Sequence, residues 1–359
     1  MHRTLARASR VPARRRSAAL AAALVAGALV LAGCGSAADD AGRTAGTGTG
    51  SASADDAFEP VTITSALGDA VIESRPERVV TLGQGSAETA IALGVVPVGI
   101  EEYSWGSDDT GYLPWIYEAV TDLGADLPVQ FTGDTELDID AILELEPDLI
   151  LAPWSGITQE QFDLLSDIAP TVAYPDLAWS IDWDEQIETV ATALGYADEG
   201  QELIDGIEQE WADAAAAHPE YADVTFSFIY TSGLGSLGVF LPDEQRVAMV
   251  RGLGLTVDPV VDTFEETEGT DSALIGLENA DELSGSDLIF TFYASDESRA
   301  EVLAQPLYQS IPAIARDSVV APSDQSFVTA SSIITPLTVP WSIDEYTALI
   351  DDALSRVDG

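Results

Sequence analysis

The chain has no lysine, a single cysteine and two histidines among its 359 residues. All 14 basic residues are therefore arginines, and they stand against 62 Asp and Glu residues. A nucleic-acid partner is excluded, because phosphate neutralisation requires clustered Lys and Arg. A polybasic membrane-binding patch is excluded for the same reason. One cysteine also rules out any disulfide within the chain.

The scarcity of histidine and cysteine restricts catalytic and metal chemistry. Beyond the N-terminal leader described below, His218 is the one histidine. Zinc or manganese capture needs several such ligands. A Ser-His-Asp triad would have to use His218, and the chain has no G-x-S-x-G string. We therefore expect a protein that is not an enzyme, needs no cofactor and captures no zinc or manganese through its own side chains.

The first 33 residues have the pattern of a secretory signal peptide. Six arginines precede an apolar run, Ala18 to Ala32, which is shorter than the roughly 20 residues that span a bilayer. Removing these 33 residues from 359 leaves 326 residues with eight arginines and all 62 acids, a formal charge of −54. Residues 34–57 are mostly small and polar, with no aromatic residue, and we expect them to form a flexible tether.

The only cysteine, Cys34, follows the string Leu31-Ala32-Gly33 at the end of the apolar run. This string resembles the lipobox of bacterial lipoproteins, which implies lipidation of Cys34. Two acyl chains on one residue suffice for stable anchoring in a lipid bilayer. We therefore expect a secreted protein anchored to the outer face of the cell membrane, in a Gram-positive envelope of actinobacterial type. A plain signal peptide followed by an incidental cysteine is the alternative.

From Phe58 onwards, short apolar runs alternate with helical patterns, which indicates an α/β fold. The first lobe covers residues 58–180. Its strands are predicted at 79–82, 95–100, 149–152 and 171–173, and its helices at 86–93, 139–145 and 159–168.

A helical region, residues 181–218, separates this lobe from a second α/β lobe, residues 219–359. Helices are predicted at 183–194 and 198–217, and the second of these, at about 30 Å, is long enough to connect two lobes. The second lobe has predicted strands at 224–230, 287–292 and 319–321 and predicted helices at 244–253 and 343–357.

Five segments of the folded part occur in an order typical of one family. They are Arg75 to Leu82, Ala92 to Gly99, Asp138 to Leu151, Ile168 to Val172 and Leu277 to Phe290. With them the chain resembles the substrate-binding lipoproteins of iron–siderophore ABC importers. The resemblance implies two Rossmann-like α/β lobes joined by one long helix, with the ligand in the cleft between them. It also implies a monomer that takes a ferric siderophore, whose chelator holds the iron, and delivers it to an ABC importer permease and its ATPase.

Ligands of open α/β sheets bind beyond the carboxyl ends of the strands. Aromatic side chains are frequent there, and they suit a bulky chelate. Arg246 lies where the family often has an arginine, whose planar donor fork suits chelate oxygens. Capping of the lobe ends by the tryptophans, and a surface ion pair for Arg246, are the alternatives. The predicted ligand-binding residues are Gln84, Trp105, Trp154, Trp179, Tyr230, Arg246, Tyr293 and Phe327.

The shortage of cations narrows the class of ligand. A ferric tricatecholate carries three negative charges and calls for several cations in the cleft, whereas the exported chain has eight arginines at a formal charge of −54. A neutral or cationic ferric hydroxamate is easier to accommodate. Haem and cobalamin receptors share the fold and remain alternatives, as does a cell-surface protein without a transport role.

The resemblance also implies an acidic residue on each lobe that meets arginines of the permease. The matching positions are Asp140, where the family usually has Glu, and Glu278. In so acidic a chain the alternative for both is an ordinary solvated surface.

Overall fold

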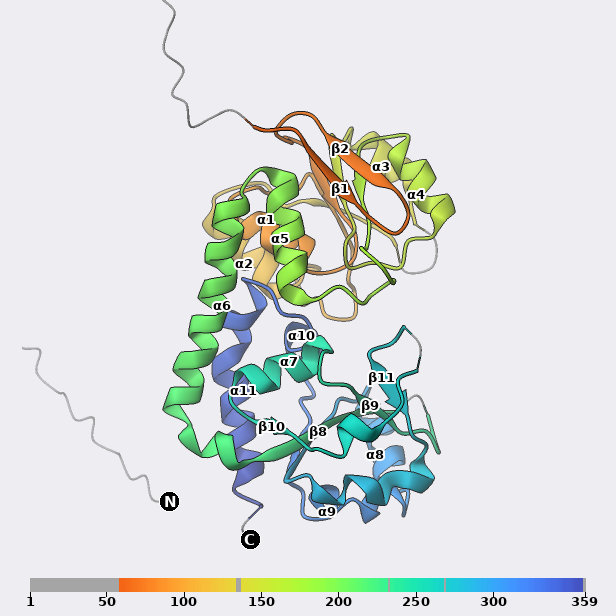
Figure 1. Cartoon of the computed structure of the whole chain (residues 1–359), viewed down its shortest axis with the longest axis vertical. Helices are drawn as coiled ribbons and strands as arrows, with labels where there is room; N and C mark the ends of the chain where they lie inside the picture. The colour runs from red at the N-terminus through yellow and green to blue at the C-terminus, as the bar shows by residue number, and fades with distance from the viewer. Residues whose placement is uncertain (1–57, 134–136, 232, 268, 358–359) are drawn as a thin grey trace, which may run out of the picture. The chain divides into compact units, whose positions relative to one another are not determined.

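The computed structural model describes residues 58–133, 137–231, 233–267 and 269–357. All of them belong to one compact unit, Asp55–Gly359. The predicted signal peptide, Cys34 and the tether lie outside the described residues. Within the described residues, no helix is both long enough and apolar enough to cross a membrane. Two lobes, each built on its own sheet, are visible in Figure 1.

The N-terminal lobe is built on a five-stranded parallel sheet of order β5-β4-β3-β6-β7. Its central strands are buried on both faces, as expected for parallel strands covered by helices. The strands are β3 (Val79–Thr81), β4 (Gly99–Glu101), β5 (Val129–Phe131), β6 (Leu149–Leu151) and β7 (Thr171–Val172), and the helices are α1 (Ser86–Ala92), α2 (Pro114–Asp122), α3 (Ile139–Glu144) and α4 (Gln159–Ser166). An antiparallel hairpin of β1 (Val61–Thr64) and β2 (Asp69–Ile72), absent from the sequence prediction, precedes the sheet.

The C-terminal lobe has a mixed sheet of order β11-β9-β8-β12-β13, with β10 also paired to β8. β9 is antiparallel to both of its neighbours, and the other pairings are parallel. The strands are β8 (Thr225–Tyr230), β9 (Gly238–Phe240), β10 (Thr256–Val257), β11 (Ser272–Leu274), β12 (Leu288–Phe290) and β13 (Val319–Val320). The helices are α7 (Gln245–Gly252), α8 (Asp296–Leu303), α9 (Pro312–Ala315), α10 (Gln325–Ala330) and α11 (Thr338–Leu354), with short 3₁₀ turns that include η3 (Leu277–Gly285).

The connecting helix is confirmed. Helix α5 (Trp183–Leu194) ends at Gly195, whose φ of 76° is the left-handed conformation that terminates many helices. Helix α6 (Ala197–Ala217) follows; its 21 residues make it about 32 Å long. It runs along one side of the molecule from one lobe to the other, with α11 beside it in the C-terminal lobe (Figure 1).

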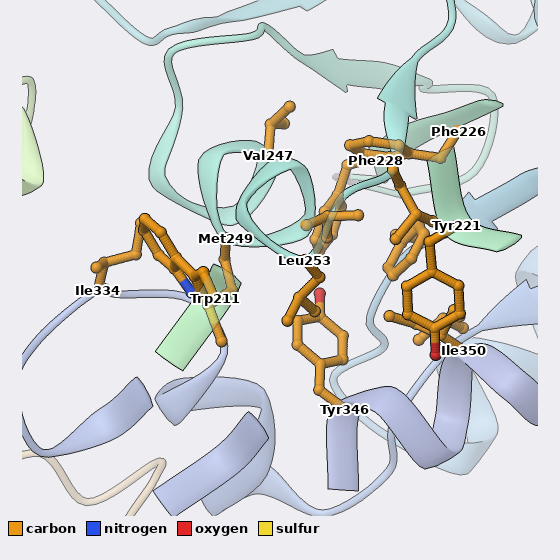
Figure 2. Close-up of a cluster of buried hydrophobic side chains, with 14 of the residues drawn as sticks. Trp211, Tyr221, Phe226, Phe228, Val247, Met249, Leu253, Ile334, Tyr346 and Ile350 are labelled. Atoms are coloured by element: carbon orange, nitrogen blue, oxygen red, sulfur yellow. Dashed lines mark hydrogen bonds between the residues drawn. The ribbon is translucent and has the colours of Figure 1, made fainter. Parts of the chain in front are cut away.

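The largest core cluster joins α6 to the C-terminal sheet (Figure 2). Trp211 of α6 packs beside Met249 of α7, and its Nε1 donates to the Met249 Sδ at 3.3 Å. Phe226 of β8 and Tyr346 of α11 complete the cluster, and both are buried. The connecting helix is therefore part of the core of this lobe.

The C-terminal segment also packs on the N-terminal lobe. Ala330, at the end of α10, is buried in a cluster with Trp115 of α2, and the Trp341 ring of α11 lies 5.4 Å from the Trp115 ring. Ser326 Oγ donates to the Gly106 carbonyl oxygen at 2.8 Å. The two lobes are thus joined by α6 and by the α10–α11 segment.

Two predicted boundaries were wrong for reasons of backbone chemistry. Strand β4 begins at Gly99 and not at Val95, because Pro97 lies in the predicted run and has no N–H for a ladder. Helix α11 begins at Thr338 and not at Ile343, because Pro340 falls in its first turn, where no intrahelical N–H bond is needed.

The contact between α5 and α6 gives a stability prediction. A Cβ added at Gly200 would lie 2.4 Å from the Ala191 Cβ, whereas one added at Gly206, in the same helix, would meet nothing within 4 Å. We expect Gly200→Ala to lower the free energy of unfolding by about 1–3 kcal/mol through overpacking. Gly206→Ala, the matched control, should raise it by about 0.5–1 kcal/mol. Urea unfolding measures both, and equal effects of the two substitutions would contradict the close packing.

Candidate ligand-binding site

A cavity lies between the lobes, at the end of β6 on one side and the start of α7 on the other. Counting the space that is open to solvent, it spans about 580 Å³. The residues that line it are Trp154, Trp179, Ile181 and Asp182 from the N-terminal lobe and Phe240, Asp243, Glu244, Gln245, Arg246, Thr270, Asp271 and Ser332 from the C-terminal lobe.

Two tryptophans form the wall contributed by the N-terminal lobe. The Trp154 and Trp179 rings meet edge to face with centroids 4.7 Å apart. Trp179 has a φ of 66°, unusual for a bulky residue, and its N–H donates to the Ser155 carbonyl oxygen at 3.3 Å. A Cβ on Gly156 would lie 2.5 Å from Trp179 Nε1, so only glycine lets the indole sit there. The Trp179 side chain is nevertheless half exposed, which leaves it available to a ligand.

Stacked aromatic rings form the facing wall in the C-terminal lobe. Phe240, at the end of β9, stacks on Tyr230 at 4.7 Å with an interplanar angle of 30°. The Tyr230 hydroxyl shares a hydrogen bond with Ser272 Oγ at 3.0 Å, so Tyr230 supports Phe240 and does not itself line the cavity. The cavity therefore has an aromatic surface on both lobes.

Arg246 lies against this second wall. Its guanidinium carbon is 4.9 Å from the Phe240 ring centroid and 5.7 Å from that of Phe292. The guanidinium is ion-paired with Glu244, while its Nε is buried without a hydrogen-bond partner. Burial raises the pKa of Glu244 although the neighbouring Arg246 lowers it. Arg246 therefore lines the cavity, and its positive charge is offset by Glu244.

Gln245 offers a donor that the sequence prediction missed. The residue is 8% exposed, and its Oε1 accepts from the Ile334 N–H at 2.9 Å. This bond fixes the orientation of the amide, so Nε2 is the free end, and Nε2 is buried without a partner. An unpaired buried donor costs about 1–3 kcal/mol. A ligand oxygen would remove that cost.

Carboxylates surround the cavity. Asp182 precedes α5, Asp243 and Glu244 precede α7, and Asp271 precedes β11. Desolvation raises the pKa of Asp182, with Asp184 and Asp243 adding to the effect. Desolvation also raises the pKa of Asp271, helped by Glu266, Glu244, Asp182 and Asp243. Carboxylates of the two lobes therefore repel one another across the cleft.

Gln84 lies elsewhere in the N-terminal lobe, in a second and smaller cavity beyond β3 that Glu88 and Glu101 also line. The Gln84 side chain is 5% exposed, and its Nε2 is buried without a partner. Its carbonyl oxygen accepts from Gln186 Nε2 at 2.6 Å.

Other predicted ligand contacts lie outside the interlobe cavity. Tyr293 is buried in the core of the C-terminal lobe, and its hydroxyl is 3.2 Å from that of Tyr308. Phe327 lies in helix α10, where it is 1% exposed and packs on Tyr346. Neither side chain is free for a ligand in this structure, so both predictions are corrected. Trp105 lies on the loop after β4, partly exposed and also outside the lining of the cavity.

The two residues predicted to meet a permease are both on the surface. Asp140 lies in the first turn of α3 and Glu278 in η3, one on each lobe, and both are exposed. Their positions are compatible with docking and with a solvated surface alike.

The sequence prediction missed four of the lining acids and the Gln245 amide. Asp182 and Asp243 directly precede predicted helices, and Glu244 begins one. Acidic residues at these positions are typical helix caps, so the sequence does not mark them as ligand contacts. Asp271 lies in a segment for which no strand was predicted. These four acids differ from the other acids of the chain only in that the fold places them at the cavity.

Two α/β lobes, a connecting helix and an aromatic interlobe cavity define a solute-binding protein. The comparisons with known proteins agree. A family profile described as periplasmic binding protein matches residues 79–325. The chain belongs to this family, which confirms the expectation of a binding protein and not an enzyme.

Several similar proteins have names that refer to siderophore binding. The probable siderophore-binding lipoprotein YfiY of Bacillus subtilis is 32% identical over 178 residues, which is 49% of this chain and 48% of that protein. The chain thus matches about half the length of this relative. The ferric enterobactin-binding periplasmic protein FepB of Escherichia coli is 23% identical over 75% of this chain and 85% of that protein. The crystal structure of Streptococcus pneumoniae PiaA in complex with ferrichrome superimposes with a TM-score of 0.75 and 30% identity, covering 82% of this chain and 99% of that one.

A buried acid near the smaller cavity gives a pH prediction. Glu88 is 1% exposed and accepts from Trp115 Nε1 at 3.0 Å and from the Gly85 N–H at 2.9 Å. Burial raises its pKa above 4.5 despite these hydrogen bonds. Because the folded-state pKa is raised, the stabilising contribution of Glu88 is complete below the unfolded pKa and is lost as the pH rises through the folded value.

Wild-type protein should therefore lose stability relative to Glu88→Gln as the pH rises from about 5 to about 8, by about 1.4 kcal/mol per unit of pKa elevation. Urea unfolding at both pH values measures the difference. A wild-type-to-variant difference that does not change with pH would contradict an elevated pKa of Glu88.

Proposed function

We propose that this protein is the substrate-binding component of an ABC importer and captures a ferric siderophore, of hydroxamate type, in the interlobe cavity. The observation that carries the proposal is the pairing of aromatic walls with two unpartnered donors, Gln245 Nε2 and Arg246 Nε. Aromatic rings suit the apolar arms of a chelate. Buried N–H donors suit the oxygens that surround its iron.

The charge of the cavity supports a hydroxamate over a catecholate. Arg246 is the one cation among the described lining residues, and Glu244 already pairs with it. A trianionic complex would enter a site with four carboxylates and no free positive charge, at a large electrostatic cost. The PiaA structure with ferrichrome supports the same class, whereas FepB, named for ferric enterobactin, has lower identity.

The proposal also covers how the protein is anchored to the membrane and how it docks to the permease. Cys34 carries the acyl chains, and the exposed carboxylates Asp140 and Glu278 meet a permease driven by its ATPase. Support comes from the lipobox-like string in this chain and from relatives that are named lipoproteins. Trp105 remains a proposed contact at the margin of the cleft.

The binding experiment uses the emission of Trp154 and Trp179, which an iron chelate in the cavity would quench. We expect strong quenching by ferric trihydroxamates and weak or no quenching by a ferric tricatecholate, ferric citrate, haem or cobalamin. Trp179→Ala should weaken binding of a ferric trihydroxamate at least about tenfold, because a stacked ring contributes on the order of 1–3 kcal/mol.

Leu143→Ala serves as the control for this experiment. Leu143 is an exposed apolar residue of α3 that does not line the cavity, so its substitution should leave affinity within about twofold. Quenching by none of the iron complexes would refute the proposal, and tighter binding of haem or cobalamin than of any siderophore would replace it.

A further inference from the structure

The residues that line the cavity carry more negative than positive charges. Asp182, Asp243, Glu244 and Asp271 line it together with a single cation, Arg246. Arg246 is ion-paired with Glu244, and Asp243 lies 3.9 Å from Arg251, which is outside the lining. Asp182 and Asp271 have no cationic partner among the described residues. A neutral ligand would leave this excess in place.

The excess negative charge comes from both lobes. Asp182 lies in the N-terminal lobe at the start of α5, and Asp243 and Asp271 lie in the C-terminal lobe. Helix α7, which follows Asp243, lies on the side of its lobe that faces the N-terminal lobe (Figure 1). Burial is the main cause of the raised pKa of Asp271, and repulsion from Asp182 of the other lobe adds to it. A cation between them would turn that repulsion into attraction.

The rest of the cavity shows that a ligand, and not only solvent, fits beside these acids. Gln245 is more than nine-tenths buried, lines the cavity and has an unpartnered Nε2. Its free N–H group calls for an acceptor such as a hydroxamate oxygen. The two indoles of the opposite wall attract a cation through their ring faces as well.

Building on the function proposed above, we propose that the ligand is a cationic ferric siderophore, whose free ammonium group is held by the carboxylates that line the interlobe cavity. Hydroxamate oxygens face Gln245 and Arg246, the apolar arms contact the aromatic walls, and the ammonium group lies with Asp182 and Asp271. The carboxylates therefore select for the charge of the ligand, while the donors recognise its chelate.

A pair of matched complexes tests this selection. Ferrioxamine B is a linear ferric trihydroxamate in which three hydroxamates neutralise the iron and one terminal ammonium adds a positive charge. Acetylation of that amine gives a neutral complex with the same chelate. We expect wild-type protein to bind the ammonium form about tenfold more tightly, and the ratio of the two dissociation constants to shrink at high salt because of screening.

Variants locate the effect. Asp182→Asn with Asp271→Asn keeps the shape of both side chains, and asparagine tolerates the positive φ of position 271. This double substitution should bring the ratio of the two dissociation constants close to one. Asp122→Asn with Asp281→Asn removes the same formal charge from exposed positions outside the cavity, and should leave the ratio at about ten.

Each outcome decides the question. Equal affinity of wild-type protein for the two complexes overturns the cationic selection while leaving siderophore binding intact. So does a ratio that survives Asp182→Asn with Asp271→Asn, or that is lost equally in the control. Failure of both complexes, and of every other ferric hydroxamate, refutes instead the proposed function on which this inference rests. Because each ratio comes from one protein sample, partial misfolding of a variant does not mimic the result.

Discussion

The spacing of the two lobes is the constraint on which the site depends. Helix α6 belongs to the core of the C-terminal lobe through Trp211 and reaches the N-terminal lobe through α5. The α10–α11 segment adds a second connection, in which Trp341 packs on Trp115 and Ser326 binds the Gly106 carbonyl oxygen. These two connections hold the facing walls of the cavity at the separation seen in the structure.

The chemical character of the cavity depends on the residues that each lobe contributes to its lining. The N-terminal lobe contributes the Trp154–Trp179 pair, and the C-terminal lobe contributes the Phe240 wall with two buried donors. Both contribute carboxylates. The chain has no lysine, and the one arginine that lines the cavity, Arg246, is ion-paired with Glu244. The acidic composition by itself concerns only solubility and general repulsion. At the cavity it leaves more carboxylates than arginines among the lining residues, which is the basis of the proposed preference for a cationic ligand.

Much of this architecture could be predicted from the sequence, because it rests on local patterns. The helices at 183–194 and 198–217 and the strand at 149–152 agree with the structure within a residue or two. The contacts between segments could not be predicted. The sequence predicts Phe327 as a ligand contact, but it is a core residue, because α10 packs against Tyr346 of α11. Gln245 and Asp271 have no distinguishing local pattern, and only the meeting of the two lobes makes them part of one cavity.

The proposed ferric siderophore would place its iron between the Trp154–Trp179 pair and Arg246. Iron scatters X-rays anomalously at its absorption edge, so crystals grown with ferrioxamine B would reveal its position directly. We expect one strong anomalous peak per molecule in the interlobe cavity, with the ammonium end of the chelator beside Asp182 and Asp271. A peak in any other part of the molecule, or an occupied chelate whose ammonium points to solvent on the far side from these acids, would contradict it.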